Sequence, residues 1–213
     1  AGAFSQTQQG NGDAFVTHFK PDAITLVYST LFGGNSYDIA NGMALNAANE
    51  VYVTGATGSA NLPTTAGALQ PHANFVPGYT QEDVFLFRLS ADGSSLVYAT
   101  YLGGTDSDGG YGIDVNGAGE AFIAGTSYSG DFPVSAKPFM TGANPQLGNG
   151  DTFAARISAD GSSLLYGTYL GGSEGEYVKS LRVNAFDEAF MVGATRSPDF
   201  PADAMSASHN GNY

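Results

Sequence analysis

The residues best suited to chemistry lie in an acidic, glycine-rich loop that reads GGTDSDGG at positions 103–110. Asp106 and Asp108 stand two residues apart, and carboxylates are the hard oxygen ligands that Ca²⁺ prefers. The likeness to an EF-hand loop ends there, because no Glu follows at the twelfth position. Asp106 and Asp108 are therefore candidate calcium ligands, although a solvated acidic loop rim is the favoured interpretation.

A second motif, GGSEG at positions 171–175, matches the G-x-S-x-G pattern of serine hydrolases. That pattern works where a strand turns sharply into a helix and exposes the serine hydroxyl. Here the flanking residues predict a loop between two strands, so we expect Ser173 to have no catalytic role. We predict no catalytic residue in the chain, and no cofactor other than calcium.

The elements that must position these residues repeat along the chain. LSADGSSLVYATYLGG at 89–104 returns as ISADGSSLLYGTYLGG at 157–172, and a decayed copy, FKPDAITLVYSTLFGG, occupies 19–34. The flanking segments keep the same register, so a unit of about 68–70 residues occurs three times. We place one domain segment over 1–213, with repeats at 13–82, 83–150 and 151–213 and with 1–12 as the tail of a preceding loop.

Each repeat predicts four short strands and no helix. In the second repeat, apolar residues alternate with period two at 83–89, and an Ala-Asp-Gly turn leads to a second strand at 96–102. The acidic loop then leads to a third strand at 111–116 and, after another turn, to a fourth at 121–127. Four antiparallel strands per repeat predict an all-β fold made of β-propeller blades.

The run DVFLFRLSADGSSLVYATYLGGTDSDGGYGIDVNGAGEAFIAGTSYSGDFP at 83–133 resembles the SBBP-type bacterial β-propeller repeat. The likeness lies in D-x-F, D-G-x-x-L-x-Y-x-T-Y-L-G-G, G-I-x-V-N and F-P, and it extends through all three repeats. The first repeat departs most, because it lacks the Asp-Gly turn, and the third has VKSLRVN at 178–184 in place of Gly-Ile. The resemblance implies a surface or secreted bacterial protein, and it implies a fold more than an activity.

By analogy with related propellers, the strand at 111–116 should be innermost and that at 121–127 should lie next to it. The two outer strands of the same blade should then come from the following repeat, at 151–157 and 164–170. This assignment of strands to blades predicts two complete blades, flanked by an outer half-blade at the start and an inner half-blade at the end. Propellers typically use about four to eight blades, and bare strand edges pair readily with other chains. We expect protein partners: a second copy in a six-bladed homodimer, or further repeats of a longer parent chain.

Charged residues also recur in the repeat register. Asp38, Asp108 and Glu176 share one position, and His18, Arg88 and Arg156 share another. Since the arginines point the same way from successive repeats, we expect them to pair with neighbouring acids. Asp114 and Arg182 share a position on the innermost strands, and their opposite charges indicate mutual neutralisation rather than an acid/base couple. Asn46, Asn116 and Asn184 should end those strands with side chains bonded to the local backbone.

The composition narrows the partners and the location. Twenty acidic against seven basic residues give a net charge of −13, which repels phosphate backbones and disfavours nucleic acid. No apolar run approaches the ~18 residues of a membrane span. The chain has no Cys, and its acidic, Gly-rich composition is typical of secreted bacterial proteins, so we expect a secreted or cell-surface location.

Two classes of function remain. The favoured hypothesis is a non-catalytic extracellular β-propeller scaffold, used in adhesion or structural assembly, because what recurs is structural and what varies lies in loops. The alternative is a carbohydrate-active enzyme with a propeller fold (a lyase or glycosidase) or a lectin-like module that binds carbohydrate. An enzyme of this kind needs a carboxylate pair or a metal in a central funnel.

Overall fold

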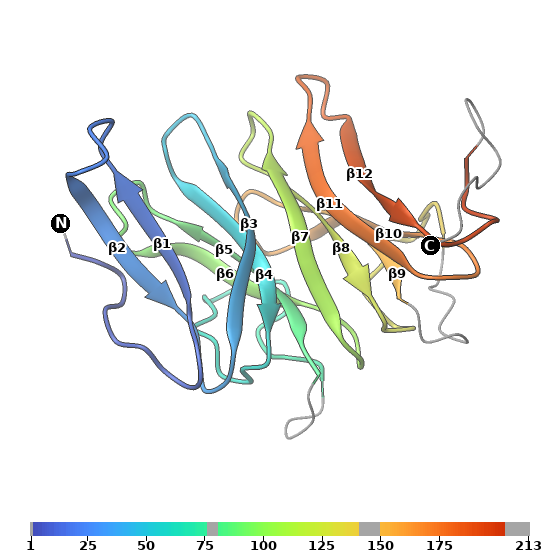
Figure 1. The fold of residues 1–213 in the computed structure, drawn as a ribbon, viewed down its shortest axis with the longest axis horizontal. Helices are drawn as coiled ribbons and strands as arrows, with labels where there is room; N and C mark the ends of the chain where they lie inside the picture. Colours follow the sequence, from blue (N-terminus) through green and yellow to red (C-terminus); the bar gives the residue numbers. More distant parts are fainter. Residues whose placement is uncertain (1, 76–80, 141–149, 203–213) are drawn as a thin grey trace.

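A computed structural model describes residues 2–75, 81–140 and 150–202, and every regular element within these ranges is a β-strand (Figure 1). The strands are β1 (Ala14–Phe19), β2 (Leu26–Phe32), β3 (Asp38–Leu45), β4 (Val51–Thr57), β5 (Asp83–Leu89), β6 (Leu96–Leu102), β7 (Asp108–Val115), β8 (Ala121–Ser127), β9 (Asp151–Ile157), β10 (Leu164–Leu170), β11 (Glu176–Val183) and β12 (Ala189–Thr195). Within the described ranges there is no helix of the length and apolarity needed to cross a membrane.

The twelve strands form four antiparallel sheets. Two sheets have four strands, in the orders β3-β4-β5-β6 and β7-β8-β9-β10, and two have two strands, β1-β2 and β11-β12. Each four-stranded sheet therefore joins the inner pair of one repeat to the outer pair of the next, in the strand order that the sequence predicts. The all-β prediction is confirmed, whereas the four sheets form an open row that does not close into a ring.

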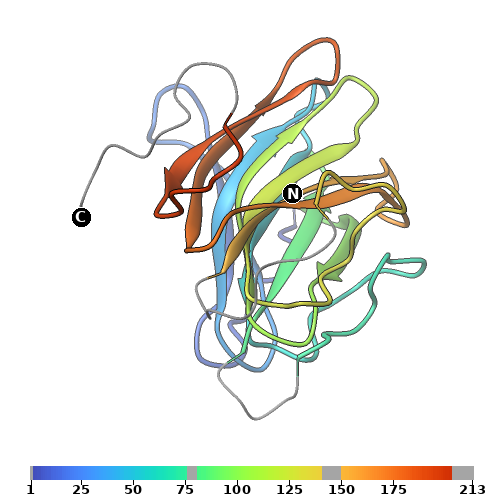
Figure 2. The same cartoon turned by 90° about the vertical axis from the view of Figure 1, so that its right-hand side faces the viewer.

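The sheets lie face to face in sequence order, which is visible from the β11–β12 end in Figure 2. β7 is central, because it pairs with β8 in its own sheet and also contacts β3 and β4 of the preceding sheet and β11 of the following one. The edge strands β3, β7 and β11 of successive sheets approach each other closely. A Cβ added at Gly42 would lie 2.6 Å from the Tyr111 carbonyl oxygen, and one added at Gly112 would lie 2.8 Å from the Leu181 nitrogen.

The Asp-Gly turns explain how the outer strands of each repeat reverse direction. Gly93 and Gly161 both have φ of +74°, a left-handed conformation that side chains disfavour. The first repeat has Ala23 at this position, and its φ is +55°. The turn still forms there, since the Ala23 N–H donates to the Lys20 carbonyl over 3.0 Å. The first repeat therefore keeps the fold at the cost of a strained alanine.

The turns that follow the inner strands are held by asparagine, as predicted. The Asn116 Oδ1 accepts the backbone N–H groups of Ala118 and Glu120 at 3.1 and 3.0 Å. Asn46 and Asn184 make the same two bonds in their own repeats. These side chains replace part of the backbone hydrogen bonding that each strand loses where it ends.

Tyrosines of the outer strands fasten the loops that connect the repeats. The buried Tyr101 hydroxyl donates to the Ser59 carbonyl at 2.7 Å and accepts the Leu62 N–H at 2.8 Å. Tyr169 makes the equivalent bonds to Ser129 and Phe132. These hydroxyl contacts explain how loops without regular structure stay fixed to the sheets.

Candidate functional sites: carboxyl pairs and an open groove along β1

The recurring arginines bind acids, as the sequence predicts. Arg88 on β5 forms an ion pair with Glu50, and its guanidinium carbon lies 5.3 Å from the centre of the Tyr52 ring. Arg156 on β9 pairs with Glu120 in the same way. These pairs cross from the inner half of a sheet to its outer half, so they join two successive repeats.

Arg156 also reaches the neighbouring sheet. Its Nη2 lies 2.7 Å from the Asp187 Oδ2, in the turn between β11 and β12. Burial lowers the pKa of Arg156, but the hydrogen bonds and charges of Glu120 and Asp187 together outweigh it, so the pKa is raised. Hydrogen bonds from Arg156 and Asn116 lower the pKa of Glu120. This cluster joins the β11-β12 sheet to the β7-β8-β9-β10 sheet.

At the two ends of the row, the same positions lack their partners. His18 stands on β1 where the other repeats have arginine, and its ring packs edge-on against Tyr28 at 5.5 Å. Glu188 stands where Glu50 and Glu120 stand, and it accepts a hydrogen bond from the Asn184 side chain. Within the described residues, neither side chain forms an ion pair.

Pairs of carboxyl groups converge on the first glycine of each Gly-Gly motif. At Gly103, the Asp108 Oδ2 lies 3.0 Å from the position that a Cβ would take, and the Asp83 Oδ1 lies nearer still. Asp13 and Asp38 approach Gly33 in the same manner, as do Asp151 and Glu176 at Gly171. Only glycine leaves room for such a pair, so the acid pair explains the first glycine of the motif.

Burial dominates the electrostatics of the central pair. Asp83 is completely buried, and burial raises its pKa to about 7 although the Asn74 N–H donates to its Oδ2 at 2.7 Å. Burial likewise raises the pKa of Asp108 to about 6, against the opposing effect of hydrogen bonds from the Gly104 N–H and the Ser129 hydroxyl. The Oδ1 atoms of Asp83 and Asp108 have no hydrogen-bond partner in the described structure.

The interpretation of the recurring acid as part of a solvated rim is wrong. Asp38, Asp108 and Glu176 are only 3%, 2% and 1% exposed. They are buried because the loops after β4, β8 and β12 fold over them and supply serine donors, Ser59, Ser129 and Ser197. Sequence reasoning missed the partner acids Asp13, Asp83 and Asp151, although their recurrence at the start of each D-x-F motif was visible.

The two calcium candidates have different environments. Asp108 is buried and hydrogen-bonded, whereas Asp106 is exposed and its Oδ1 accepts the Ser107 N–H at 2.9 Å. In the parts of the chain that the structure describes, no three His, Cys, Asp or Glu side chains are grouped so that they could hold a metal. Asp106 and Asp108 stay candidate calcium ligands.

Ser173 lies in the loop between β10 and β11, where its hydroxyl donates to the Asp199 Oδ1 at 2.8 Å. Thr105 makes the same contact with Asp131 at 3.0 Å. A hydrogen bond that recurs with a different hydroxyl residue indicates that this position ties two loops together.

Asp114 and Arg182 do not neutralise each other. The Asp114 Oδ2 accepts the backbone N–H of Val183 at 2.8 Å, which links β7 to β11. The Arg182 Nη1 donates to the Leu181 carbonyl at 2.6 Å instead. The expected ion pair is therefore replaced by two backbone contacts, because each side chain lies nearer to a main-chain group of β11.

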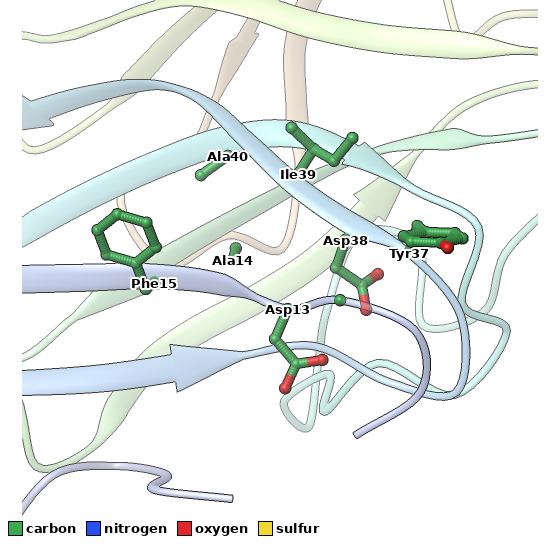
Figure 3. Close-up of a pocket in the computed structure, with 8 residues that line it drawn as sticks. Asp13, Ala14, Phe15, Tyr37, Asp38, Ile39 and Ala40 are labelled. Atoms are coloured by element: carbon green, nitrogen blue, oxygen red, sulfur yellow. The ribbon is translucent and has the colours of Figure 1, made fainter. Parts of the chain in front are cut away.

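An open groove runs along the edge of β1 that does not pair with β2. It consists of successive cavities of 340, 280 and 380 Å³, which run from Gly12 to Phe19 along β1. One wall is formed by β1, and the other mainly by β3. We call this feature the β1 groove. Figure 3 shows one end of it, with Asp13, Ala14 and Phe15 opposite Tyr37, Asp38, Ile39 and Ala40.

A smaller cavity, of 80 Å³, is lined by three tyrosines. Tyr111, Tyr128 and Tyr177 are each partly exposed, and Glu82 lines the same cavity. Burial, together with the charge of Asp38, raises the pKa of Glu82. Sequence reasoning missed this site, because its residues occupy unrelated positions of the repeat and only folding brings them together.

Comparison with known proteins adds no assignment. The sequence matches no protein-family model, and no curated protein shows significant similarity to it. The functional argument therefore depends on the sequence motifs and on the geometry described above.

Proposed function

We propose that this chain is a set of β-propeller repeats of the SBBP type, and that it serves as a non-catalytic scaffold outside a bacterial cell. The observation that carries the proposal is the use of the recurring polar groups. The arginines, the asparagines and the buried acids bind neighbouring strands and loops of the chain itself. Structural contacts thus account for the residues that recur between repeats.

The open surfaces support a role in assembly. The β1 groove extends along a free strand edge and exposes large apolar side chains, including Phe15 and Phe19. Exposed apolar surface of this kind marks protein contacts, and a free edge supplies backbone hydrogen bonds to a partner. A partner protein that completes the row of sheets therefore fits this surface.

A direct test is an activity screen of the native protein against a panel of acidic and neutral polysaccharides, with new reducing ends and unsaturated products as readouts. A scaffold gives no turnover above a heat-denatured control. Turnover that is lost in Asp114→Asn or Asp108→Asn, with folding intact, would establish the enzyme alternative.

A second function, carbohydrate binding, is favoured by the tyrosine-lined cavity. Tyrosine offers an apolar ring face and a hydroxyl that can hydrogen-bond, a combination suited to sugars. Titration with the same polysaccharides by calorimetry tests this function. Binding that is weakened in Tyr111→Ala but retained in Tyr37→Ala would support it, and equal behaviour of the two variants would exclude this cavity as the site.

A further inference from the structure

We propose that the partner of the β1 groove is a second copy of this chain, whose β12 pairs antiparallel with β1 while its β11 lies beside β3. This inference rests on the proposed assembly function and specifies its partner. The joined strands would form a sheet in the order β11-β12-β1-β2. That order repeats the two complete sheets, in which the inner pair of one repeat meets the outer pair of the next.

The register of the contact follows from the two complete sheets. In these, Thr54 pairs with Leu86 and Ala124 pairs with Ala154. The equivalent positions in the half-sheets place Val192 of one copy opposite Val16 of the other. A slip by one residue would turn every side chain to the opposite face of the sheet. We therefore expect this register and not one shifted by a residue.

Apolar residues of β1 are exposed only because the sheet is incomplete. The Phe15 side chain is 68% exposed, whereas its equivalents Phe85 and Phe153 are 0% exposed. Phe19 is also exposed, while its equivalents Leu89 and Ile157 are buried. The first repeat thus keeps the side chains of a covered strand.

The β12 edge and the far wall of the groove show the same contrast. Phe190 is 58% exposed, whereas the equivalent Tyr52 and Phe122 are 0% exposed. On β3, Met43 is 57% exposed, whereas the equivalent Ile113 is 2% exposed and belongs to a core cluster with Tyr52 and Leu86 of the preceding sheet. Both surfaces carry the residues that would be buried if one covered the other.

Phe15 of one copy and Gly193 of the other are complementary in shape. In the complete sheets, an aromatic ring packs over a glycine of the adjacent strand: the Phe85 Cζ lies 2.8 Å from the position that a Cβ on Gly55 would take. Phe153 covers Gly125 in the same way. The transferred register places Phe15 of one copy over Gly193 of the other, where the nearest atoms at present belong to the backbone of β11.

Charges at the joint are also complementary. The register brings His18 of one copy to Glu188 of the other, in the place of the pairs Arg88–Glu50 and Arg156–Glu120. The His18 ring would lie over Phe190, as Arg156 lies over Phe122 at 4.8 Å. Each half-sheet therefore supplies one side chain at the position of the Arg–Glu pairs, with His in place of Arg.

One position sets a limit on the contact. Gly42 and Gly112 allow close approach between neighbouring edge strands, but the third repeat has Ser180 there. The contact between β11 of one copy and β3 of the other must therefore be wider than the two contacts within the chain. Two copies joined at both ends would contain six four-stranded sheets, within the range of about four to eight blades of known propellers.

Cysteine cross-linking tests the register. Because the chain has no native Cys, only the introduced cysteines can form a disulfide. The double variants Val16→Cys/Val192→Cys and Thr17→Cys/Met191→Cys place cysteines opposite each other. Because opposite residues alternate between hydrogen-bonded and non-hydrogen-bonded pairs, the two variants test one pair of each kind. The control, Val16→Cys/Met191→Cys, is shifted by one residue. We expect at least one matched variant, but not the control, to give a covalent dimer of twice 21.9 kDa on oxidation. Equal cross-linking of the matched and shifted variants would overturn the proposal.

Solution mass and side-chain variants test the contact without cysteine. By sedimentation, the unmodified chain should form a dimer, Phe15→Asp should remain a monomer, and Phe139→Asp should behave as the unmodified chain, since Phe139 is equally exposed but lies in a loop away from the groove. His18→Arg should lower the dimer dissociation constant about two- to five-fold. A chain that stays monomeric at all concentrations would overturn the second-copy proposal but leave the scaffold proposal standing. Polysaccharide turnover would instead overturn the scaffold proposal, whatever the mass.

Discussion

The carboxyl groups of Asp83 and Asp108 meet at Gly103, inside the protein. Both are buried, and burial raises the pKa of Asp83 to about 7 and that of Asp108 to about 6. Asp83 comes from the start of β5 and Asp108 from the start of β7. The pair therefore joins two neighbouring sheets, and its protonation state is linked to the stability of that junction.

The first prediction concerns pH. In the unfolded chain, Asp titrates near ~4, so between about pH 4 and 7 the folded protein binds more protons than the unfolded chain. The free energy of unfolding should therefore fall as the pH rises through this window. Thermal melts at a series of pH values should show this fall. Asp83→Asn should remove most of it, because an amide stays neutral and its NH₂ can donate to Asp108.

Asp106→Asn is the matched control, because it removes one exposed acid from the same loop. This variant should keep the pH dependence of the unmodified protein. A fall in stability that is equally steep in Asp83→Asn and in the control would show that the buried pair does not cause it.

The second prediction concerns the strained turn at Ala23. Ala23→Gly should stabilise the protein by about 1 kcal/mol, because glycine adopts positive φ without the steric cost that alanine bears. Urea unfolding measures the change. Ala91→Gly is the control, since Ala91 lies in the corresponding turn of the next repeat and is not among the residues with positive φ. This control should be neutral or destabilising, and stabilisation of the same size there would refute the argument.

The third prediction concerns calcium. Asp108 is buried and accepts hydrogen bonds from the Gly104 N–H and the Ser129 hydroxyl, and Asp106 is exposed, so we expect chelator to leave the melting midpoint unchanged. Melts with added Ca²⁺ and with chelator decide the matter. A fall of several degrees on chelation that disappears in Asp106→Asn would establish Asp106 and Asp108 as ligands.

The fourth prediction concerns the joint between the β7-β8-β9-β10 sheet and the β11-β12 sheet. Arg156→Met should destabilise the protein by about 1–3 kcal/mol, because Glu120 and Asp187 would both lose a charged donor. Lys137→Met controls for the loss of one positive charge, since Lys137 is exposed on a loop. Equal denaturation midpoints for the two variants would mean that the cluster does not hold the sheets together.

Much of the fold follows from local signals. Alternation in segments such as 83–89 and the Asp-Gly turn at Gly93 depend on neighbouring residues alone, so the repeat length and the strand order could be predicted. Burial of Asp108 could not, because it depends on a loop some twenty residues away that folds back and places Ser129 beside it. The Asp114–Arg182 pairing failed for a similar reason, since Asp114 binds a backbone N–H of the neighbouring sheet and Arg182 binds the Leu181 carbonyl of its own strand.

The β1 groove was only half predictable. The phase of the repeats indicated free strand edges at both ends of the row, but the cavities beside β1 arise from the spacing between β1 and β3. The tyrosine cavity left no trace in the sequence, because Tyr111, Tyr128 and Tyr177 do not share a repeat position.

Hydrogen exchange measured at increasing protein concentration tests the central claim, assembly through free strand edges, most directly. Backbone amides of Ala14–Phe19 and Ala189–Thr195 should become protected as the concentration rises, because each strand gains a second neighbour. Amides of Ala121–Ser127, which are paired on both sides already, should exchange at one rate throughout. Exchange at Ala14–Phe19 and Ala189–Thr195 that does not change with concentration, in a particle of 21.9 kDa, would contradict the account.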